Sequence, residues 1–99
     1  VDLEAKGGWD GRTALMWAAM YGKLGCLEHL VAKGAKLDAT DEDGWTALMY
    51  AAANGKLDCL EHLVAKGAKL DATSNVGWTA LMYAAANGKL DCLEHLVAK

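Results

Sequence analysis

Three Cys-x-x-His pairs are the side chains that most suggest a chemical role, namely Cys26 with His29, Cys59 with His62, and Cys92 with His95. A thiol and an imidazole three residues apart lie on one side of a helix, where they can bind zinc or act as a nucleophile and its base. Each pair supplies only two zinc ligands. If the three pairs lie on equivalent helices of stacked units, these helices are about 8–10 Å apart, and two pairs are then too far from each other to complete a tetrahedral site together. Because no orienting group or oxyanion site accompanies the pairs, we expect neither a metal site nor a catalytic dyad.

The cysteine and the histidine of each pair are better explained as parts of an amphipathic helix. Cys59 lies beside Leu60 and Leu63 on the apolar side, which predicts a small buried hydrophobe. His62 follows Asp58 by four residues, and we expect these two side chains to pair on the solvated side.

The acidic run Asp41-Glu42-Asp43, followed by Gly44, is similar to the start of a calcium loop. The later ligands and the bidentate Glu are missing, so we expect a solvated acidic loop, either for solubility or for a basic edge on a partner. A glycine-rich phosphate loop is absent, and the only serine, Ser74, lies in a turn-rich segment. We therefore expect no enzymatic activity and no cofactor.

The composition excludes further classes. Ten Lys and Arg residues stand against thirteen Asp and Glu residues, for a net charge of −3, which does not suit a nucleic-acid binder. We expect no membrane segment, since no apolar run approaches about eighteen residues. We also expect no signal peptide, and therefore a cytoplasmic or recombinantly produced chain. An odd number of cysteines, three, favours reduced thiols.

The sequence repeats itself with a period of 33 residues. Residues 44–66 and 77–99 are identical, and residues 11–33 differ from 44–66 at five positions. A unit of this size cannot bury its own apolar face, so the period predicts stacked units, of which three are about the minimum for an independent fold.

Each unit is predicted to contain two short helices. In the second unit Thr46 is a typical N-cap, and the apolar stripe after it ends at Asn54-Gly55, which can adopt the left-handed backbone of a helix end. A second amphipathic helix begins at Leu57 and ends at Gly67. The polar segment 34–45 between units is too long for a minimal link and predicts an extended, hairpin-like finger.

The segments TALMWA (13–18) and TALMYA (46–51 and 79–84) resemble the ankyrin signature TPLHxA. The resemblance continues through the second helix and covers nearly the whole chain. It implies an all-α ankyrin-repeat solenoid, in which three stacked helix-turn-helix units are joined by hairpin-like fingers. We expect one domain over 1–99, with repeats at about 8–40, 41–73 and 74–99 and with 1–7 as the end of a preceding finger.

Two departures from the family pattern recur in all three repeats. Ala14, Ala47 and Ala80 stand where the family has Pro, and Met16, Met49 and Met82 stand where it has His. These changes remove a pre-set φ angle and the family's inter-repeat hydrogen bonding, with Met as an apolar gap-filler instead. We expect the fold to persist with lower stability.

The resemblance implies protein binding on the concave surface formed by the finger tips and the exposed face of each first helix. The residues expected there are Trp9, Asp10, Arg12, Trp17, Met20, Tyr21, Glu42, Asp43, Trp45, Tyr50, Asn54, Trp78 and Tyr83. All seven aromatic residues map onto this surface, as do four of the five differences between repeats 1 and 2. Exposed Trp, Tyr and Arg side chains are enriched in interface hot spots.

Two interpretations of these rings remain open. The rings that recur, Trp45 with Trp78 and Tyr50 with Tyr83, either shield one another along the solenoid or contact a partner. The cluster of Trp17, Met20 and Tyr21 has no copy in the other repeats, and we expect it to contact a partner.

The ends of the array are its least typical parts. Repeat 3 copies repeat 2 through Lys99 and lacks the polar outer face of a capping repeat, so we expect end-to-end association into homo-oligomers or a fragment of a longer array. In repeat 1, Gly25 replaces the helix-start acid found at Asp58, which weakens that helix.

Identity over 23 consecutive positions suggests an engineered array or a recent duplication, and we favour engineering. The sequence leaves two functions open: a protein-binding module, and a structural array whose only partner is itself.

Overall fold

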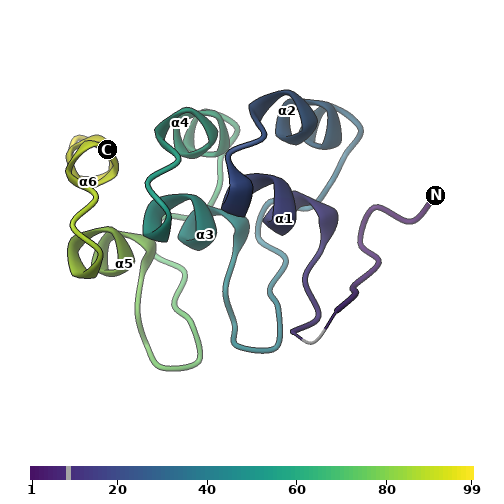
Figure 1. Cartoon of the computed structure of the whole chain (residues 1–99), viewed down its shortest axis with the longest axis horizontal. Coiled ribbons are helices and arrows are strands. Elements are labelled where there is room, and N and C mark those ends of the chain that lie inside the picture. Colours follow the sequence, from purple (N-terminus) through teal and green to yellow (C-terminus); the bar gives the residue numbers. More distant parts are fainter. Residues whose placement is uncertain (9) are drawn as a thin grey trace.

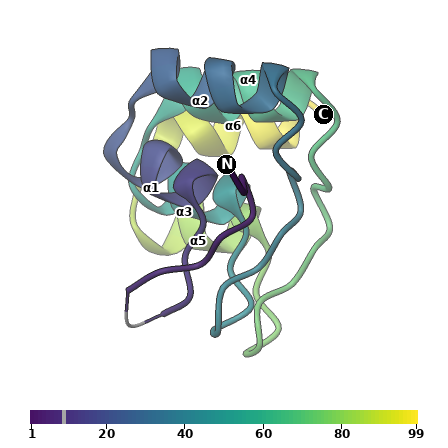
Figure 2. The same cartoon turned by 90° about the vertical axis from the view of Figure 1, so that its right-hand side faces the viewer.

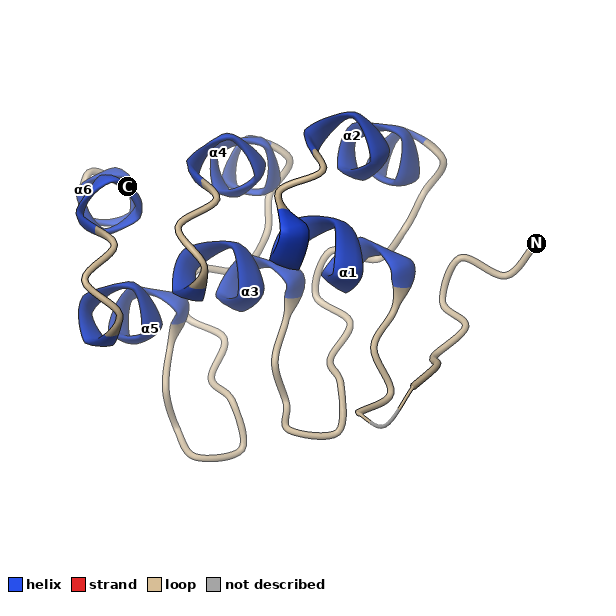
Figure 3. Ribbon diagram, in the orientation of Figure 1, coloured by secondary structure: helices blue, strands red, loops and turns tan. Residues whose placement is uncertain are grey.

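The helices begin and end where the repeated capping residues predict them. The computed structural model describes residues 1–8 and 10–99, and six helices lie within them (Figure 1, Figure 3). The helices are α1 (Ala14–Tyr21), α2 (Leu24–Ala32), α3 (Ala47–Ala53), α4 (Leu57–Ala65), α5 (Ala80–Ala86) and α6 (Leu90–Val97). Apart from an isolated antiparallel bridge between Gly7 and Arg12, these residues otherwise form turns and loops. The expected all-α repeat architecture is confirmed.

The helices stack in two rows (Figure 1). The first helix of each repeat (α1, α3, α5) lies in the inner row and the second (α2, α4, α6) in the outer row, and each packs on its counterpart in the next repeat. The fingers extend from the inner row, and Figure 2, which faces the N-terminal end, shows them projecting in one direction. None of the helices in the described part of the chain is long and apolar enough to cross a membrane.

Threonine caps each inner-row helix, as expected for Thr46. The Thr46 hydroxyl accepts a hydrogen bond from the Met49 N–H at 3.3 Å, and the Met49 sulfur accepts one from the Thr46 N–H at 3.4 Å. Met49 is buried, as expected of a gap-filler, but it also takes the place of the Glu or Gln side chain that completes a capping box. Met16 completes the same arrangement in α1, whereas in α5 only the Thr79 hydroxyl accepts a hydrogen bond. The sequence interpretation of the methionines as purely apolar missed this second role of Met16 and Met49.

The glycine after each of the first two inner-row helices, α1 and α3, lies against a lysine of the next repeat. Gly55 has a φ angle of 68°, so it adopts the predicted left-handed backbone. A Cβ atom added at Gly55 would lie 3.0 Å from Cδ of Lys89, and one added at Gly22 would lie 2.8 Å from Cδ of Lys56. The left-handed backbone is what favours glycine at these two positions, and any larger residue would also require the flexible lysine stem to move.

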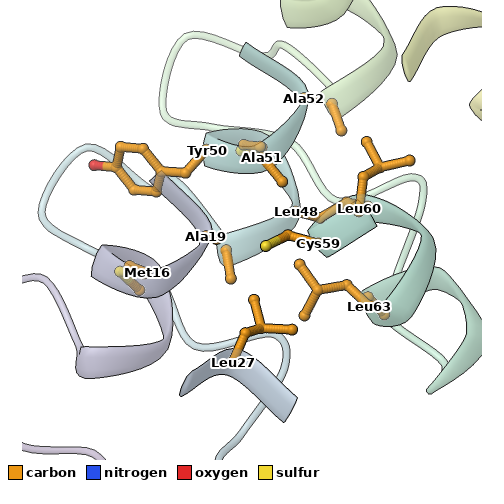
Figure 4. Close-up of a cluster of buried hydrophobic side chains, with 14 of the residues drawn as sticks. Met16, Ala19, Leu27, Leu48, Tyr50, Ala51, Ala52, Cys59, Leu60 and Leu63 are labelled. Atoms are coloured by element: carbon orange, nitrogen blue, oxygen red, sulfur yellow. The ribbon is translucent and has the colours of Figure 1, made fainter. Parts of the chain in front are cut away.

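The core consists mainly of small and branched side chains between adjacent repeats (Figure 4). The side chains of Ala19, Leu27, Cys59, Leu60 and Leu63 are fully buried there. Small residues in the inner row let neighbouring helices approach closely, and leucines of the outer row fill the remaining space. This packing holds the fingers in a fixed relation to one another.

Backbone hydrogen bonds close each finger and tie it to the next. The N–H of Asp41 donates to the carbonyl of Trp45 at 3.1 Å, which closes the second finger. The N–H of Glu42 donates to the carbonyl of Asp10 at 2.9 Å, and the N–H of Asn75 donates to the carbonyl of Asp43 at 3.0 Å, so that adjacent finger tips are joined. The tips are thus positioned by main-chain geometry.

Segment 1–7 makes a hydrogen bond with repeat 1 that resembles a hydrogen bond between repeats 1 and 2. A carboxylate oxygen of Glu4 accepts a hydrogen bond from the N–H of Lys36 at 3.0 Å. One repeat later, Asp38 accepts one from the N–H of Lys69 at the same distance, 3.0 Å. Glu4 therefore makes the same kind of hydrogen bond to repeat 1 that Asp38 makes to repeat 2.

Candidate functional site

Six side chains form a continuous series of contacts across the three repeats, which we call the aromatic ladder. Its members, in spatial order, are Trp17, Arg12, Tyr50, Trp45, Tyr83 and Trp78. Arg12, Trp45 and Trp78 occupy equivalent positions, and each contacts the ring five residues later in its own repeat. Arg12 and Trp45 also contact the ring 38 residues later, which belongs to the next repeat. The 33-residue period therefore continues the stack from one repeat to the next.

Neighbouring members of the ladder are in direct contact, and its aromatic pairs are tilted, with angles of 41°, 39° and 44° between ring planes. The Arg12 guanidinium carbon lies 4.9 Å from the centre of the Trp17 ring and 5.3 Å from that of Tyr50. Ring centres are 4.8 Å apart for Trp45 and Tyr50 and 4.1 Å apart for Trp45 and Tyr83. Arg12 thus serves as a cationic member of a stack that is otherwise aromatic.

Tyr50 and Tyr83 are not on an exposed face, and this part of the sequence interpretation is wrong. Their exposed fractions are only 6% and 8%. Tyr50 is covered by Trp45 from its own repeat and by Arg12 from the preceding one, whereas Tyr83 is covered by Trp78 and Trp45. For these two rings the structure supports mutual shielding along the solenoid.

The Tyr50 hydroxyl is the centre of a buried polar network. It donates to a carboxylate oxygen of Asp41 and accepts a hydrogen bond from Nε of Arg12 at 3.0 Å. Burial, together with the hydrogen bond to Asp41, raises the pKa of Tyr50 to about 12. The hydrogen bond to Tyr50 raises the pKa of the Arg12 guanidinium.

Asp41 is likewise buried, contrary to the expected solvated acidic loop. Its exposed fraction is 6%, and its other carboxylate oxygen accepts hydrogen bonds from the N–H groups of Asp43 and Trp45, both at 2.9 Å. In repeat 3 the equivalent residue, Ser74, lies 2.7 Å from the Tyr83 hydroxyl. Asp41 therefore anchors its finger to the inner row, and only Glu42 and Asp43 of the acidic run are exposed.

The remaining site residues divide by exposure. Tyr21, Glu42, Asp43, Asn54 and Trp78 are exposed, whereas Asp10, Arg12, Trp17, Met20 and Trp45 are partly buried. Arg12 is paired with Asp10, with 2.9 Å between the guanidinium nitrogen and the carboxylate oxygen. Trp9 lies outside the described residues.

The expected cluster of Trp17, Met20 and Tyr21 is divided. Trp17 and Tyr21 stack with nearly parallel rings, 6.0 Å between ring centres, whereas Met20 packs against the core. Trp17 and Tyr21 also border a depression of about 300 Å³ at the N-terminal end of the stack, lined by Ala14, Trp17, Ala18, Tyr21, Lys23, Cys26 and Leu30. Sequence reasoning assigned only Trp17 and Tyr21 to the binding surface and missed the other five residues. The signal that could have found those five is that they correspond to Ala47, Ala51, Lys56, Cys59 and Leu63 of repeat 2.

The Cys and His residues have separate structural roles. Cys59 and Cys92 are buried, as expected for Cys59, and burial raises the pKa of the Cys59 thiol to about 11. His62 does not pair with Asp58 as expected. Its Nδ1 lies 3.9 Å from a carboxylate oxygen of Glu28 in the preceding repeat. Cys26 is exposed because it occupies the first repeat.

Comparison with known proteins identifies the repeat. A family model described as ankyrin repeats, in three copies, matches residues 15–99. A search of the curated proteins finds no match. The family match spans most of the chain and agrees with the repeated pairs of helices and the fingers between them. The chain belongs to the ankyrin repeat family.

Proposed function

We propose that this chain is a non-enzymatic protein-binding scaffold whose partner contacts the fingers and the adjacent edge of the inner row. Ankyrin repeats generally mediate protein interactions. The observation that carries the proposal is the ring of Trp78, 40% exposed, at the base of the third finger, whose tip is hydrogen-bonded to the tip that carries the exposed Glu42 and Asp43. A large apolar ring beside charged groups is typical of an interface hot spot and its rim.

The rigidity of the fingers supports this proposal. Adjacent tips are joined by main-chain hydrogen bonds, and the aromatic ladder fixes the base of each finger. A partner that binds a surface already ordered does not have to order it, which favours affinity. Because Asp10 neutralises Arg12 whereas Glu42 and Asp43 form no ion pair within the described residues, a basic partner surface fits best.

The test is capture on the immobilised chain, followed by titration of the purified captured protein against variants. Trp78→Ala and Asp43→Lys should each raise the dissociation constant at least ~10-fold, since hot-spot truncation and a reversed rim charge both weaken binding. Asp71→Lys, a matched change at an exposed residue outside the candidate surface, should leave it unchanged. If the captured protein binds all three variants equally well, this surface is not the binding site.

A second candidate is a structural array that associates end to end. Leu81 and Met82 favour it, because they are 38% and 48% exposed whereas their copies Leu48 and Met49 are each 1% exposed. The identity of residues 44–66 and 77–99 supports construction of the array from one repeat sequence.

A further inference from the structure

The two ends of the solenoid expose side chains that are buried wherever a neighbouring repeat is present. At the C-terminal end these are Leu81 and Met82 of α5, whose copies in α3 are covered by repeat 3. At the N-terminal end they include Ala14, which is exposed, whereas its copy Ala47 is 1% exposed. The chain thus contains both halves of an interface that it already forms internally.

We propose that the α1–α2 end of one copy of this chain docks on the α5–α6 end of a second copy, in the register of the internal repeats. The inference rests on the second candidate function and specifies its geometry. Residues 77–99 are identical to 44–66, so the receiving surface presents the same side chains on which repeat 3 packs within the chain. The occupant is therefore a second copy rather than an unrelated partner.

The docking surface of repeat 1 keeps most of the side chains used inside the chain. Five residues that line the depression at this end are the same residue types as their copies in repeat 2, of which Lys56 packs over Gly22 of repeat 1; they are Ala14, Ala18, Lys23, Cys26 and Leu30. At two positions repeat 1 has a larger side chain: Trp17 stands where repeat 2 has Tyr50, and Tyr21 stands where repeat 2 has Asn54. The substitutions enlarge the apolar area of this end without adding a charge.

Lys23 supplies the first specific contact. Within the chain, Lys56 packs over Gly22 and Lys89 packs over Gly55, whereas nothing lies within 4 Å of a Cβ atom added at Gly88. A depression of about 120 Å³ remains there, lined by Ala84, Ala85, Gly88, Lys89, Leu90 and Leu93. In the internal register the exposed Lys23 of the second copy fills this depression with its aliphatic stem.

The aromatic ladder supplies the second contact. Trp45 lies between Tyr50 and Tyr83, but Trp78 contacts only Tyr83, at 5.2 Å between ring centres. The position that would cover the open face of Trp78 is occupied in repeat 1 by Trp17. Docking therefore continues the ladder from one copy into the next.

A polar pair supplies the third contact. His62 lies 3.9 Å from Glu28, and His95 lies 3.7 Å from Glu61, each pair joining adjacent outer-row helices. The same spacing across the junction pairs Glu94 of one copy with His29 of the other. Because the two docking surfaces differ, the contact is head-to-tail and leaves both outer ends free, so assembly is open-ended and grows with concentration.

Two single substitutions test the register, because each blocks one end. Ala14→Glu places a carboxylate on the docking surface, and at the first position of α1 it suits the helix dipole, so the monomer should fold. Met82→Glu places one on the receiving surface, where Met82 is exposed in the monomer. Each should raise the dissociation constant ~100-fold or more, because an unpaired carboxylate would be buried.

Sedimentation velocity over a concentration series gives the readout. The parent chain should show a weight-average mass that grows with concentration, and each variant alone should remain monomeric. An equal mixture of the two variants should form a 1:1 dimer and nothing larger, because each copy retains one functional end. Ala65→Glu, the same residue change at an exposed site in repeat 2, should associate like the parent.

The contrary outcomes are separable. A parent chain that is monomeric at every concentration overturns the second candidate function together with this inference. If the parent associates and Ala14→Glu still does so, the head-to-tail register is overturned but the second candidate function is not. Dimers formed by Met82→Glu alone have the same consequence, because they indicate pairing of like ends. Circular dichroism of each variant verifies folding, and titration of the captured protein against Asp43→Lys, a change in the repeat 2 finger that no junction contact uses, tests the first function independently.

Discussion

Replacing Gly25 with Asp should stabilise the chain, because repeat 1 alone lacks an acidic residue in the first turn of its outer-row helix. Asp58 and Asp91 occupy the equivalent positions in α4 and α6. The Asp58 carboxylate accepts a hydrogen bond from the N–H of Cys59 at 2.8 Å, one of the helix N–H groups without a partner in the helix itself. Gly25 is exposed, its φ angle is not positive, and nothing lies within 4 Å of an added Cβ atom, so Asp fits without strain.

The expected gain is the sum of two modest terms. Removing glycine from the helix contributes a few tenths of a kcal/mol, and a carboxylate in the first turn contributes about 0.3–1 kcal/mol. We therefore expect the free energy of unfolding to rise by about 1 kcal/mol. For a domain of this size that corresponds to an increase in Tm of about 4–8 °C.

Thermal and urea unfolding followed by circular dichroism, at two protein concentrations, measures this change. The reverse substitution Asp58→Gly provides a matched control and should lower stability by a similar amount. An unchanged or lower Tm for Gly25→Asp would refute the reasoning, and a shift that varies with protein concentration would assign the effect to association.

Three further predictions concern the interior. Asp41→Ala should cost about 2–4 kcal/mol in urea unfolding, because two backbone N–H groups and the Tyr50 hydroxyl lose a charged acceptor, whereas Asp41→Ser, which copies repeat 3, should cost less. Stability should fall between about pH 10 and pH 12, by at most about 2–3 kcal/mol, since the Tyr50 pKa is raised from 10.0 to about 12 and the unfolded chain releases this proton first. Tyr50→Phe should reduce that slope, and an unchanged slope would argue against the raised pKa. Leu60→Ala should lower the free energy of unfolding by about 3–4 kcal/mol and Leu93→Ala by only about 1–2 kcal/mol, because Leu60 is fully buried and its copy Leu93 is partly exposed. Equal losses would contradict the stacking of repeats as the cause of the difference.

The elements of the fold could be predicted from the sequence because their signals are local. The Thr46 cap, the left-handed Gly55 and the start of a helix at Leu57 each depend on residues within a few positions. The period of 33 residues then places the units next to one another without information about distant contacts. Such features need no knowledge of what lies opposite them.

The exposure of the candidate site could not be predicted in the same way. Helical periodicity places Tyr50 on the side of α3 opposite Leu48, but Arg12 of another repeat covers it. Asp41 belongs to a run of acids that is usually solvated, and that run does not reveal the hydrogen bond from the Tyr50 hydroxyl, nine residues later. His62 likewise pairs with Glu28 through the register between helices, which a single helix does not reveal.

The identical sequences of α3 and α5 provide an internal calibration of how strongly neighbouring repeats couple. Both helices read ALMYAAA and are preceded by the same three residues, so their amides exchange with solvent at the same intrinsic rates when unfolded. Their surroundings differ, since α3 packs between two repeats and α5 packs against one. The ratio of amide protection at matched positions therefore reports the free energy that one additional neighbour contributes to local opening, with residue type cancelled.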